Sequence, residues 1–413
     1  MKNSLYTELI KEDIYNIYND EVTFISNQES VSTFANIKLQ TSPYPEIIMY
    51  SKHTFPLKGN IELFSTNYEI KTKKNHHIYE RGSEIHYVNE NYDEIQEFTL
   101  YLNEISSNHT MVDRVIFFIM NCSHIGLTYL KQTEYHFEHD DWIIDFEFRP
   151  DKNIETHYDD LKRNRSFDIT HIGSISKKNN KSFMTYEIEE VVSKIEWYLS
   201  FCSAQKVFIP IQFGYKNNAK NWENYIIKES HIYPFQFNYG WVPIGAINDF
   251  NIFFSQVSQK LSDELWRDVL EVVLEWYLTL NMDGMMENKI ISIHIALEQI
   301  AWNYLVIQEQ ILDREAYNKL RATDILRLLF YQLNISRNIR GNFIDHTIIK
   351  KYNNDGVYMF VDCRNNLIHP QKKNDIFKSK DSKFIVYSQG VYFLERAITK
   401  LCGYKGKYKK LIM

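Results

Sequence analysis

The sequence predicts an α+β multidomain protein, in which a β-rich N-terminal domain of sandwich or barrel-like type precedes an all-α helical bundle. Up to about residue 185, short runs of apolar and aromatic residues alternate with polar turn residues. Beyond residue 250, apolar residues recur at helical spacing instead. The chain has 413 residues, more than one hydrophobic core usually fills. We therefore expect two domains, residues 1–248 and 249–413.

The first domain carries several runs with the length and composition of strands. Examples are residues 21–25, 46–50 and 142–148, and polar clusters such as residues 177–181 separate such runs. The chain contains 29 Tyr and 26 Phe, residue types that favour pleated, half-buried surfaces. One helix is expected to interrupt the strands near residues 186–203, where apolar residues return to helical spacing.

The second domain is predicted to be a bundle of about five helices with short links. Its expected segments are a helix through Leu265–Tyr277 that stops near Gly284, residues 287–308, a helix that follows an N-cap at Thr323, residues 354–368, and residues 384–401.

Charge and cysteine usage narrow the possible classes of protein. The net charge is −6, which argues against non-specific coating of nucleic acid but allows an enzyme that touches a few phosphates. The four cysteines form no C-x-x-C pair and are interpreted as reduced thiols. Neither a signal peptide nor a membrane-spanning run is evident, so we expect a cytoplasmic protein without a membrane partner.

The segment 354–368 contains an arginine where the helical pattern calls for an apolar residue. Helical spacing places Arg364 in the middle of the apolar stripe. A guanidinium that faces a bundle core is costly unless it is paired or reaches a cleft. The expected stripe consists of Val357, Phe360, Val361, Leu367 and Ile368.

Two further polar residues are expected beside Arg364. Asn365 and His369 are four residues apart, so they share one edge of the helix, and Pro370 should end the helix just after His369. An arginine fork binds phosphate oxygens, and a histidine moves protons near neutral pH. An asparagine can orient either group. This set of residues suits phosphodiester cleavage without a metal or other cofactor.

The same residues also allow structural interpretations. Arg364 could be paired with Glu298 on the preceding long helix, and His369 could be favoured by the helix dipole. Elsewhere, His136 and His139 precede Asp140 and Asp141 in a small cluster. That cluster could bind a metal or form a solvated loop.

The Arg-Asn-x-x-x-His pattern at residues 364–369 resembles the HEPN superfamily. Looser Arg…His spacings occur at three other places, but only this one combines the asparagine, the apolar helix and the terminating proline. The helix segment 293–299, with its Ala-Leu-Glu run, is similar to HEPN domains of the ApeA type. ApeA-like proteins also place a β-rich domain before the HEPN domain.

This resemblance implies a metal-independent endoribonuclease effector of bacterial anti-phage (abortive infection) defence. It would act on RNA, with tRNA as one candidate, as a homodimer through the helical domain. Arg364 would bind the scissile phosphate, His369 would act as acid or base, and Asn365 would position them. Glu298 would hold Arg364 or be purely structural.

The resemblance leaves other roles open. Lys372 and Lys373 would meet flanking phosphates of the RNA or simply be solvated. The N-terminal domain would bind a phage-derived trigger or ligand and control the nuclease. One alternative is a non-catalytic HEPN dimerisation module with a partner- or ligand-binding β domain. Another is a glycan- or capsid-binding sandwich with a helical oligomerisation tail.

Overall fold

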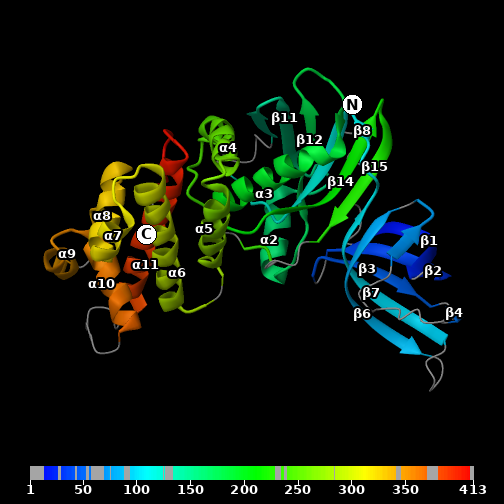
Figure 1. Cartoon of the computed structure of the whole chain (residues 1–413), viewed down its shortest axis with the longest axis horizontal. Coiled ribbons are helices and arrows are strands. Elements are labelled where there is room, and N and C mark those ends of the chain that lie inside the picture. The colour runs from blue at the N-terminus through cyan, green and yellow to red at the C-terminus, as the bar shows by residue number, and fades with distance from the viewer. Residues whose placement is uncertain are drawn as a thin grey trace. The chain divides into compact units, whose positions relative to one another are not determined.

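The computed structural model divides into two compact units (Figure 1). A strand-rich unit comprises residues 1–123, 129–196 and 206–237, and a helical unit comprises residues 124–128, 197–205 and 238–413. The predicted α+β multidomain architecture, with antiparallel strands first and helices second, is confirmed. The residues that the structure describes are 14–26, 29–41, 44–52, 55–56, 69–74, 76–87, 94–123, 125, 134–227, 234–236, 240–282, 284–340, 346–369 and 380–409.

One antiparallel sheet of thirteen strands dominates the described part of the strand-rich unit. Its strand order is β10-β11-β12-β9-β14-β15-β7-β3-β2-β1-β5, with β4 and β6 also paired to β7, while β8 and β13 pair separately. The strands are β1 (Ile14–Ser26), β2 (Glu29–Gln40), β3 (Glu46–Ser51), β4 (Phe55–Pro56), β5 (Glu69–Thr72), β6 (His77–Tyr87), β7 (Glu94–Ser106), β8 (Met111–Val112), β9 (Arg114–Met120), β10 (Glu134–His139), β11 (Trp142–Phe148), β12 (Ile169–Lys177), β13 (Phe183–Met184), β14 (Phe208–Lys216) and β15 (Ala219–Ile226).

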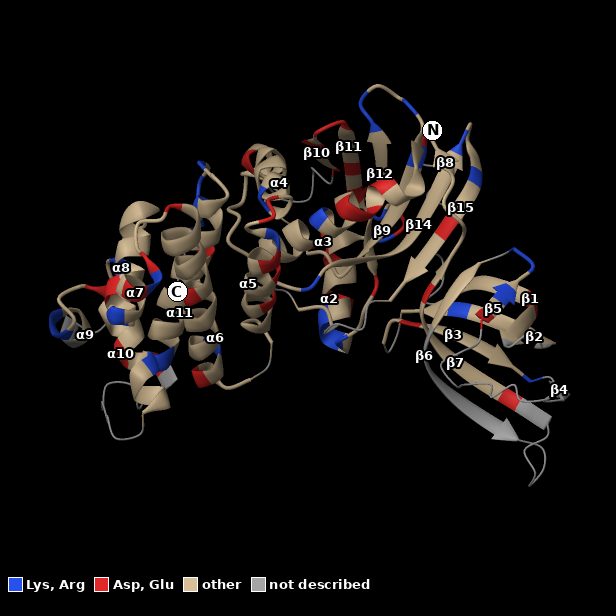
Figure 2. Ribbon diagram, viewed as in Figure 1, with Lys and Arg blue, Asp and Glu red and all other residues tan. Residues whose placement is uncertain are grey.

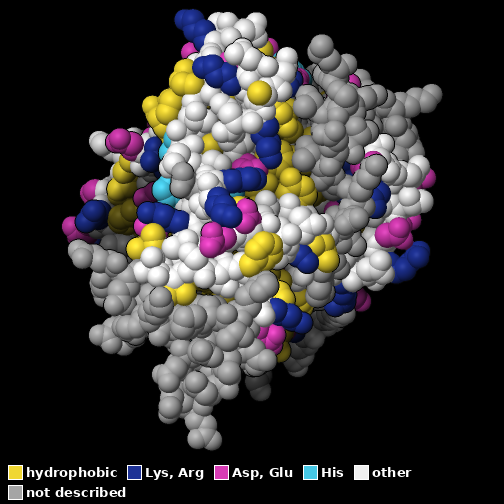
Figure 3. All heavy atoms as spheres, turned by 90° about the vertical axis from the view of Figure 1, so that its right-hand side faces the viewer, with side chains coloured by type: hydrophobic (Ala, Val, Ile, Leu, Met, Phe, Trp, Pro, Cys, Tyr) yellow, Lys and Arg dark blue, Asp and Glu magenta, His cyan; other side chains and the backbone are white. Residues whose placement is uncertain are grey.

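Alternating side chains build the core of this sheet. In β11, every second residue is buried, as expected for a strand with one face on a hydrophobic core. The core draws on strands far apart in the sequence, and Phe24, Leu100, Phe118 and Phe213 are all at most 1% exposed within it. Exposed residues on one face of the molecule mix Lys, Arg, Asp and Glu with small hydrophobic patches (Figure 3).

Tight turns explain two of the hairpins. Asn217 and Asn218 have φ of 50° and 64° between β14 and β15, the left-handed pair that a type I′ turn requires. Asp140 has φ of 49° and, with Asp141, links β10 to β11. The cluster of His136, His139, Asp140 and Asp141, which was expected to bind a metal or form a solvated loop, thus belongs to a hairpin. Its two histidines lie on β10.

The side chain of His136 lies between two acidic side chains, Asp145 and Glu138. Its Nδ1 lies 2.7 Å from Asp145 Oδ1, and the Asp145 hydrogen bond raises the pKa of His136. Within the described ranges, no group of three His, Cys, Asp or Glu side chains is arranged to hold a metal ion. Metal-free chemistry nevertheless stays a prediction.

Two helices and a short 3-10 helix accompany the sheet. Helix α2 (Ile154–Asn164) was not predicted, and the Asn153 side chain caps it by accepting from two backbone N–H groups. The 3-10 helix η1 (Thr185–Ile188) leads into α3 (Glu189–Ser203), which confirms the helix expected near residues 186–203. One of the divisions between the two units falls inside α3, after Glu196.

A buried arginine anchors the end of the sheet beside α2. Arg149 is 2% exposed and donates from Nε and Nη2 to the two carboxylate oxygens of Asp151, at 2.8 and 2.7 Å. Its Nη1 donates to Asp168 Oδ2 at 2.9 Å. Burial alone would lower the pKa of Arg149, but these two carboxylates raise it above its usual value. Arg149 is therefore a structural arginine with charged partners.

The helical unit contains the predicted bundle and several further helices. Helices were expected at the positions of α5, α6, α8, α10 and α11, whereas α4, α7 and α9 were not predicted. The bounds are α4 (Ile247–Leu261), α5 (Arg267–Thr279), α6 (Met286–Trp302), the π-helical segment η2 (Asn303–Gln308), α7 (Arg314–Lys319), α8 (Ala322–Gln332), α9 (His346–Lys351), α10 (Gly356–Ile368) and α11 (Lys380–Leu401).

One predicted helix start is wrong and another shifts by two residues. Thr323 is already inside α8, and Arg321 occupies the N-cap position without a side-chain hydrogen bond. Helix α10 begins at Gly356 rather than Asn354, because the Asp355 side chain accepts hydrogen bonds from the backbone N–H groups of Val357 and Tyr358.

Helix α6 forms the centre of the bundle and contacts α5, α8, α10 and α11. By length and composition alone, Met286–Gln308 is long and apolar enough to cross a membrane, and it is the single stretch of this kind in the described chain. More than half of its most apolar window, 56%, is buried inside the protein. Packing against four helices accounts for this apolar composition.

A buried carboxyl group holds the end of the described chain against the bundle. Glu395 on α11 accepts hydrogen bonds from Tyr277 of α5 (2.8 Å) and from Tyr408. The backbone N–H of Lys409 also donates to the Trp241 carbonyl at 3.1 Å. Complete burial raises the pKa of Glu395 to about 7. Because the folded state holds this proton more tightly than the unfolded state, ionisation of Glu395 weakens the fold.

Replacing Glu395 by Gln should therefore change how stability depends on pH. Glu395 binds its proton more tightly when folded, so its contribution is complete below pH 4.5 and is lost as the pH rises through about 7. As the pH rises from 5 to 8.5, the free energy of unfolding of Glu395→Gln minus that of the wild type should increase by up to about 3 kcal/mol. Urea unfolding measures this difference. The exposed Glu275→Gln on α5 is the control, and a pH-independent difference for Glu395→Gln would contradict the assignment.

Candidate functional site

Helix α10 is fixed at its first turn by acidic and basic side chains. Asp355 caps the helix, and Arg327 of α8 donates to Asp355 Oδ2 from Nη2 and Nε, at 2.6 and 2.9 Å. At the other end, the last helical residue is Ile368. The helix therefore presents its C-terminal turn, which carries the predicted site residues, in a defined orientation.

The buried face of α10 differs from the predicted stripe near its end. The buried residues include Val357, Phe360, Val361 and also Cys363. Leu367 is only half-buried and Ile368 is 39% exposed, so the predicted stripe is wrong in its last turn. Arg364 consequently lies at the border of the buried face rather than in its middle, and is half-buried.

The guanidinium of Arg364 has few partners. Its Nη1 donates to Asn365 Oδ1 at 3.1 Å, a neutral acceptor. Its Nε is buried and has no hydrogen-bond partner among the described residues. A buried N–H without an acceptor costs about 1–3 kcal/mol, so this arginine retains the capacity to bind a further acceptor.

Glu298 on α6 lies near Arg364 but is oriented by another residue. Its Oε2 is 3.3 Å from His294 Nδ1, one turn earlier on α6. Within the described chain Arg364 and Glu298 form no direct salt bridge, so the expected ion pair is not observed. Burial acts to raise the pKa of Glu298, but the nearby His294 and the charge of Arg364 lower it below its usual value.

His294 is a buried residue that the sequence interpretation missed. It is 0% exposed, and its ring stacks on Phe360 of α10 at a centroid distance of 6.0 Å. Neither ring nitrogen has a well-aligned hydrogen bond to a described residue. The sequence did contain a signal, because His294 and Glu298 are four residues apart on one helix.

Tyr317 of α7 lies next to Glu298. Its hydroxyl donates to the Glu298 carbonyl at 3.4 Å, and its ring meets Trp302 edge to face at 4.9 Å. Burial raises the pKa of Tyr317 to about 12, and the Glu298 charge adds to this shift. The group formed by His294, Glu298, Tyr317, Arg364 and Asn365 is called the α6–α10 cluster below.

His369 lies at the same helix end but outside this cluster. It was expected in the last turn, yet with ψ of 95° it is the C-cap, one residue past the helix. Its backbone N–H donates to the Asn365 carbonyl at 2.9 Å, and its side chain is exposed. No side-chain hydrogen bond joins it to Arg364 or Asn365 in the described part. Lys372 and Lys373 lie outside the described residues.

This arrangement can bind an anion and place an imidazole beside it. The Asn365 oxygen faces Arg364, which leaves the Asn365 amide N–H groups available as donors. Arg364 and Asn365 together can therefore donate to a phosphate oxygen pair. The exposed His369 is reachable from solvent and can transfer a proton. Lys, Arg, Asp and Glu residues are interspersed along the helices of the helical unit (Figure 2).

The chain resembles proteins of the YopA type. Residues 107–237 match the YopA central domain, and residues 263–413 match the YopA C-terminal domain. A relative, the SPbeta prophage-derived uncharacterized protein YopA of Bacillus subtilis (strain 168), is 29% identical over 313 residues, which cover 74% of this chain and 70% of the relative. No solved structure matches the chain. None of these descriptions mentions HEPN or ApeA, so that resemblance stays a prediction.

Replacing His294 by Leu should stabilise the helical unit. The two ring nitrogens of His294 are buried and have no well-aligned hydrogen bond, although Glu298 Oε2 lies 3.3 Å from Nδ1. Burying such a polar ring costs free energy, and a leucine of similar size removes that cost. We expect the free energy of unfolding to rise by about 1 kcal/mol, as measured by urea unfolding. The exposed His369→Leu serves as the control and should change stability by less than about 0.5 kcal/mol. A clear loss of stability in His294→Leu would mean that the imidazole has stabilising polar partners.

Proposed function

We propose that this protein is a metal-independent endoribonuclease whose active site contains Arg364, Asn365 and His369. The observation that best supports this proposal is that the guanidinium of Arg364 has few hydrogen-bond partners. Arg149 in the same chain shows how a structural arginine is satisfied, with two carboxylates on its fork. Arg364 instead has one neutral partner and a buried Nε without a described partner. An anionic ligand such as a phosphodiester would complete its set of hydrogen bonds.

The chemistry follows from these side chains. The guanidinium of Arg364 neutralises the charge that develops on the non-bridging phosphate oxygens. The RNA 2′-oxygen attacks phosphorus while a neutral imidazole takes its proton, and the 5′-oxygen leaves with a proton from a protonated imidazole. The products are a 2′,3′-cyclic phosphate and a 5′-hydroxyl. Two copies of His369 in a homodimer would divide these two proton transfers.

The α6–α10 cluster supports a positioning role for Glu298. Its pKa is lowered, so it carries a negative charge near Arg364 without occupying the hydrogen-bonding fork. A nearby negative charge orients a guanidinium and favours its retention at the helix border. Glu298 is therefore proposed to hold Arg364 in place for substrate, as the sequence resemblance implied. Lys372 and Lys373 are proposed to contact flanking phosphates.

The biological setting is proposed from the resemblance and from the relative. An ApeA-like defence effector would act in the cytoplasm, cleave RNA such as tRNA, and be released when its N-terminal unit detects a phage-derived trigger. The YopA relative is named as prophage-derived, which is compatible with conflict between phages.

A second candidate function is a non-catalytic dimerisation module. It is favoured by one observation: the His369 side chain forms no hydrogen bond with Arg364 or Asn365 in the described part of a single chain. In that case the bundle would only assemble copies, and the strand-rich unit would bind a partner or ligand.

A cleavage assay with the full chain separates the two. Wild type incubated with total RNA and with tRNA should produce 2′,3′-cyclic phosphate ends, equally well in EDTA. Arg364→Ala and His369→Ala should each lower the rate at least 100-fold, the scale of a lost acid–base or electrostatic group. The exposed Arg321→Ala is the matched control and should retain wild-type activity.

Two results would overturn the nuclease proposal. One is the absence of cleavage by wild type while light scattering shows intact dimers, which supports the dimerisation module. The other is cleavage that persists in both Arg364→Ala and His369→Ala, which places the chemistry elsewhere.

A further inference from the structure

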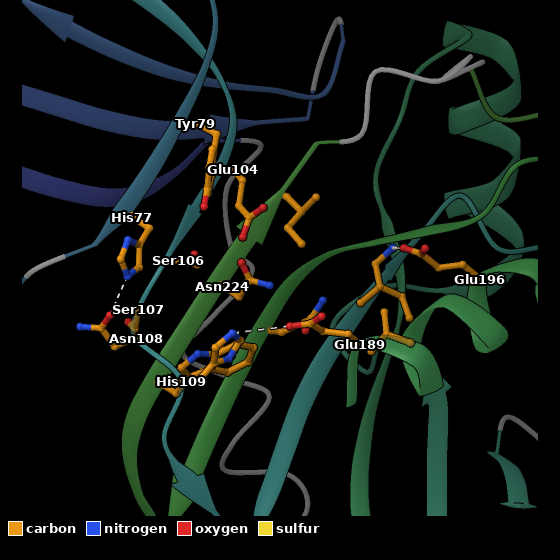
Figure 4. Close-up of a pocket in the computed structure, with 15 residues that line it drawn as sticks. His77, Tyr79, Glu104, Ser106, Ser107, Asn108, His109, Glu189, Glu196 and Asn224 are labelled. Atoms are coloured by element: carbon orange, nitrogen blue, oxygen red, sulfur yellow. Dashed lines mark hydrogen bonds and ion pairs between the residues drawn. The ribbon is translucent and has the colours of Figure 1, made fainter. Parts of the chain in front are cut away.

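A pocket of about 500 Å³ lies in the strand-rich unit, on the sheet face opposite the hydrophobic core (Figure 4). Strand register builds its floor. His77 of β6 pairs with Ser106 of β7, which pairs with Asn224 of β15, which pairs with Gln212 of β14. Directly opposed residues of neighbouring strands point to the same face, so these four polar side chains form one row across the sheet.

The residues next to this row confirm which face it occupies. Ile105, Tyr225 and Ile211 are one position away on the same three strands, pair with one another, and are at most 4% exposed in the core. Asn224 and Gln212 are nevertheless only 8% and 5% exposed. The polar row is therefore not an ordinary solvated sheet face but the covered floor of a cavity.

Two polar groups at this floor lack partners. The Asn224 Oδ1 acceptor and the Trp222 Nε1 donor are buried and have no hydrogen-bond partner among the described residues. Trp222 also lines the pocket and is 4% exposed. A buried donor or acceptor of this kind costs free energy unless something binds it. A ligand that satisfies both must carry a hydrogen-bond donor and an acceptor.

The charged residues that line the pocket indicate which charge a ligand should carry. The lining residues include three glutamates, Glu104, Glu189 and Glu196, and no lysine or arginine. Glu196 already accepts from the Ile209 N–H, and Glu189 lies 3.6 Å from His109. The Glu104 carboxylate has no hydrogen bond or ion pair to any described residue. Figure 4 shows Glu104 and Asn224 on neighbouring strands, with Glu189 on the helix across the pocket.

We propose that this pocket binds an organic cation that carries an amine or guanidinium group and a carbonyl or hydroxyl acceptor. The cationic group pairs with Glu104 and donates to Asn224 Oδ1, and the acceptor receives the Trp222 indole N–H. The volume lies within the range of small-molecule sites. Rings of Tyr79 and Trp222 at the lining also suit a cation. Anionic ligands such as nucleotides are disfavoured because three glutamates and no lysine or arginine are among the described lining residues, and one of the two lining histidines, His109, already lies beside Glu189.

The proposal is tested by calorimetric titration of the full chain with L-argininamide at constant ionic strength. Agmatine has the same guanidinium and amine but lacks the carbonyl, and glutarate is the anionic control. We expect saturable binding of argininamide at one site per chain, weaker binding of agmatine, and no binding of glutarate. The proposal does not depend on the nuclease site, because Arg364 and His369 play no part in it.

Three variants locate the site and distinguish its parts. Glu104→Gln, a half-buried residue whose side chain has no described partner, should weaken argininamide binding at least tenfold without loss of folding as judged by circular dichroism. Trp222→Phe should bind argininamide and agmatine equally, because it lacks the indole donor. The exposed Glu134→Gln on β10 should bind as wild type does. Absence of saturable argininamide binding, unchanged binding in Glu104→Gln, or binding of glutarate would each overturn the proposal.

Discussion

The close approach of three helices in the bundle determines where the candidate active site lies. A Cβ on Gly390 of α11 would come within 2.6 Å of the Phe360 ring and 3.1 Å of Ile293, so only glycine allows α6, α10 and α11 to meet there. This contact places Phe360 of α10 against His294 of α6. One helical turn further along both helices, the same packing brings Arg364 near Glu298. The position of the guanidinium is thus a consequence of core packing rather than of its own hydrogen bonds.

Two arginines of the chain illustrate two ways of placing a guanidinium in a protein interior. Arg149 is almost completely buried, and carboxylates occupy its fork on both sides, which is how a structural arginine avoids an uncompensated charge. Arg364 is half-buried, has one amide partner, and has a carboxylate nearby that does not reach its fork. Only the second arrangement leaves donors for a ligand, and this difference underlies the proposed nuclease function.

Periodic features could be predicted from the sequence, whereas features built by long-range register could not. The helix that carries Arg364 and the long apolar helix α6 follow from their spacing, and so does the end of α10 near His369. The exposure of Ile368 was not predicted, because helical spacing alone does not show where neighbouring helices stop covering a face. Arg364 was the expected partner of Glu298, but the structure places His294, one turn earlier on the same helix, beside the Glu298 carboxylate. The polar pocket was not foreseeable, since its floor joins residues 77, 106, 212 and 224 through strand pairing.

Selective ¹⁵N labelling of arginine tests the central claim most directly, because the Nε–H signals of Arg364 and Arg149 can be followed in one sample. Titration with uridine 3′-monophosphate, a product-like phosphate, should shift the Arg364 Nε–H signal saturably and leave the Arg149 signal unchanged, since the fork of Arg149 is already occupied. Assignment follows from Arg364→Lys and Arg149→Lys. An Arg364 signal that does not respond to the phosphate would contradict the account, because its unpaired Nε–H would then have no ligand-binding role.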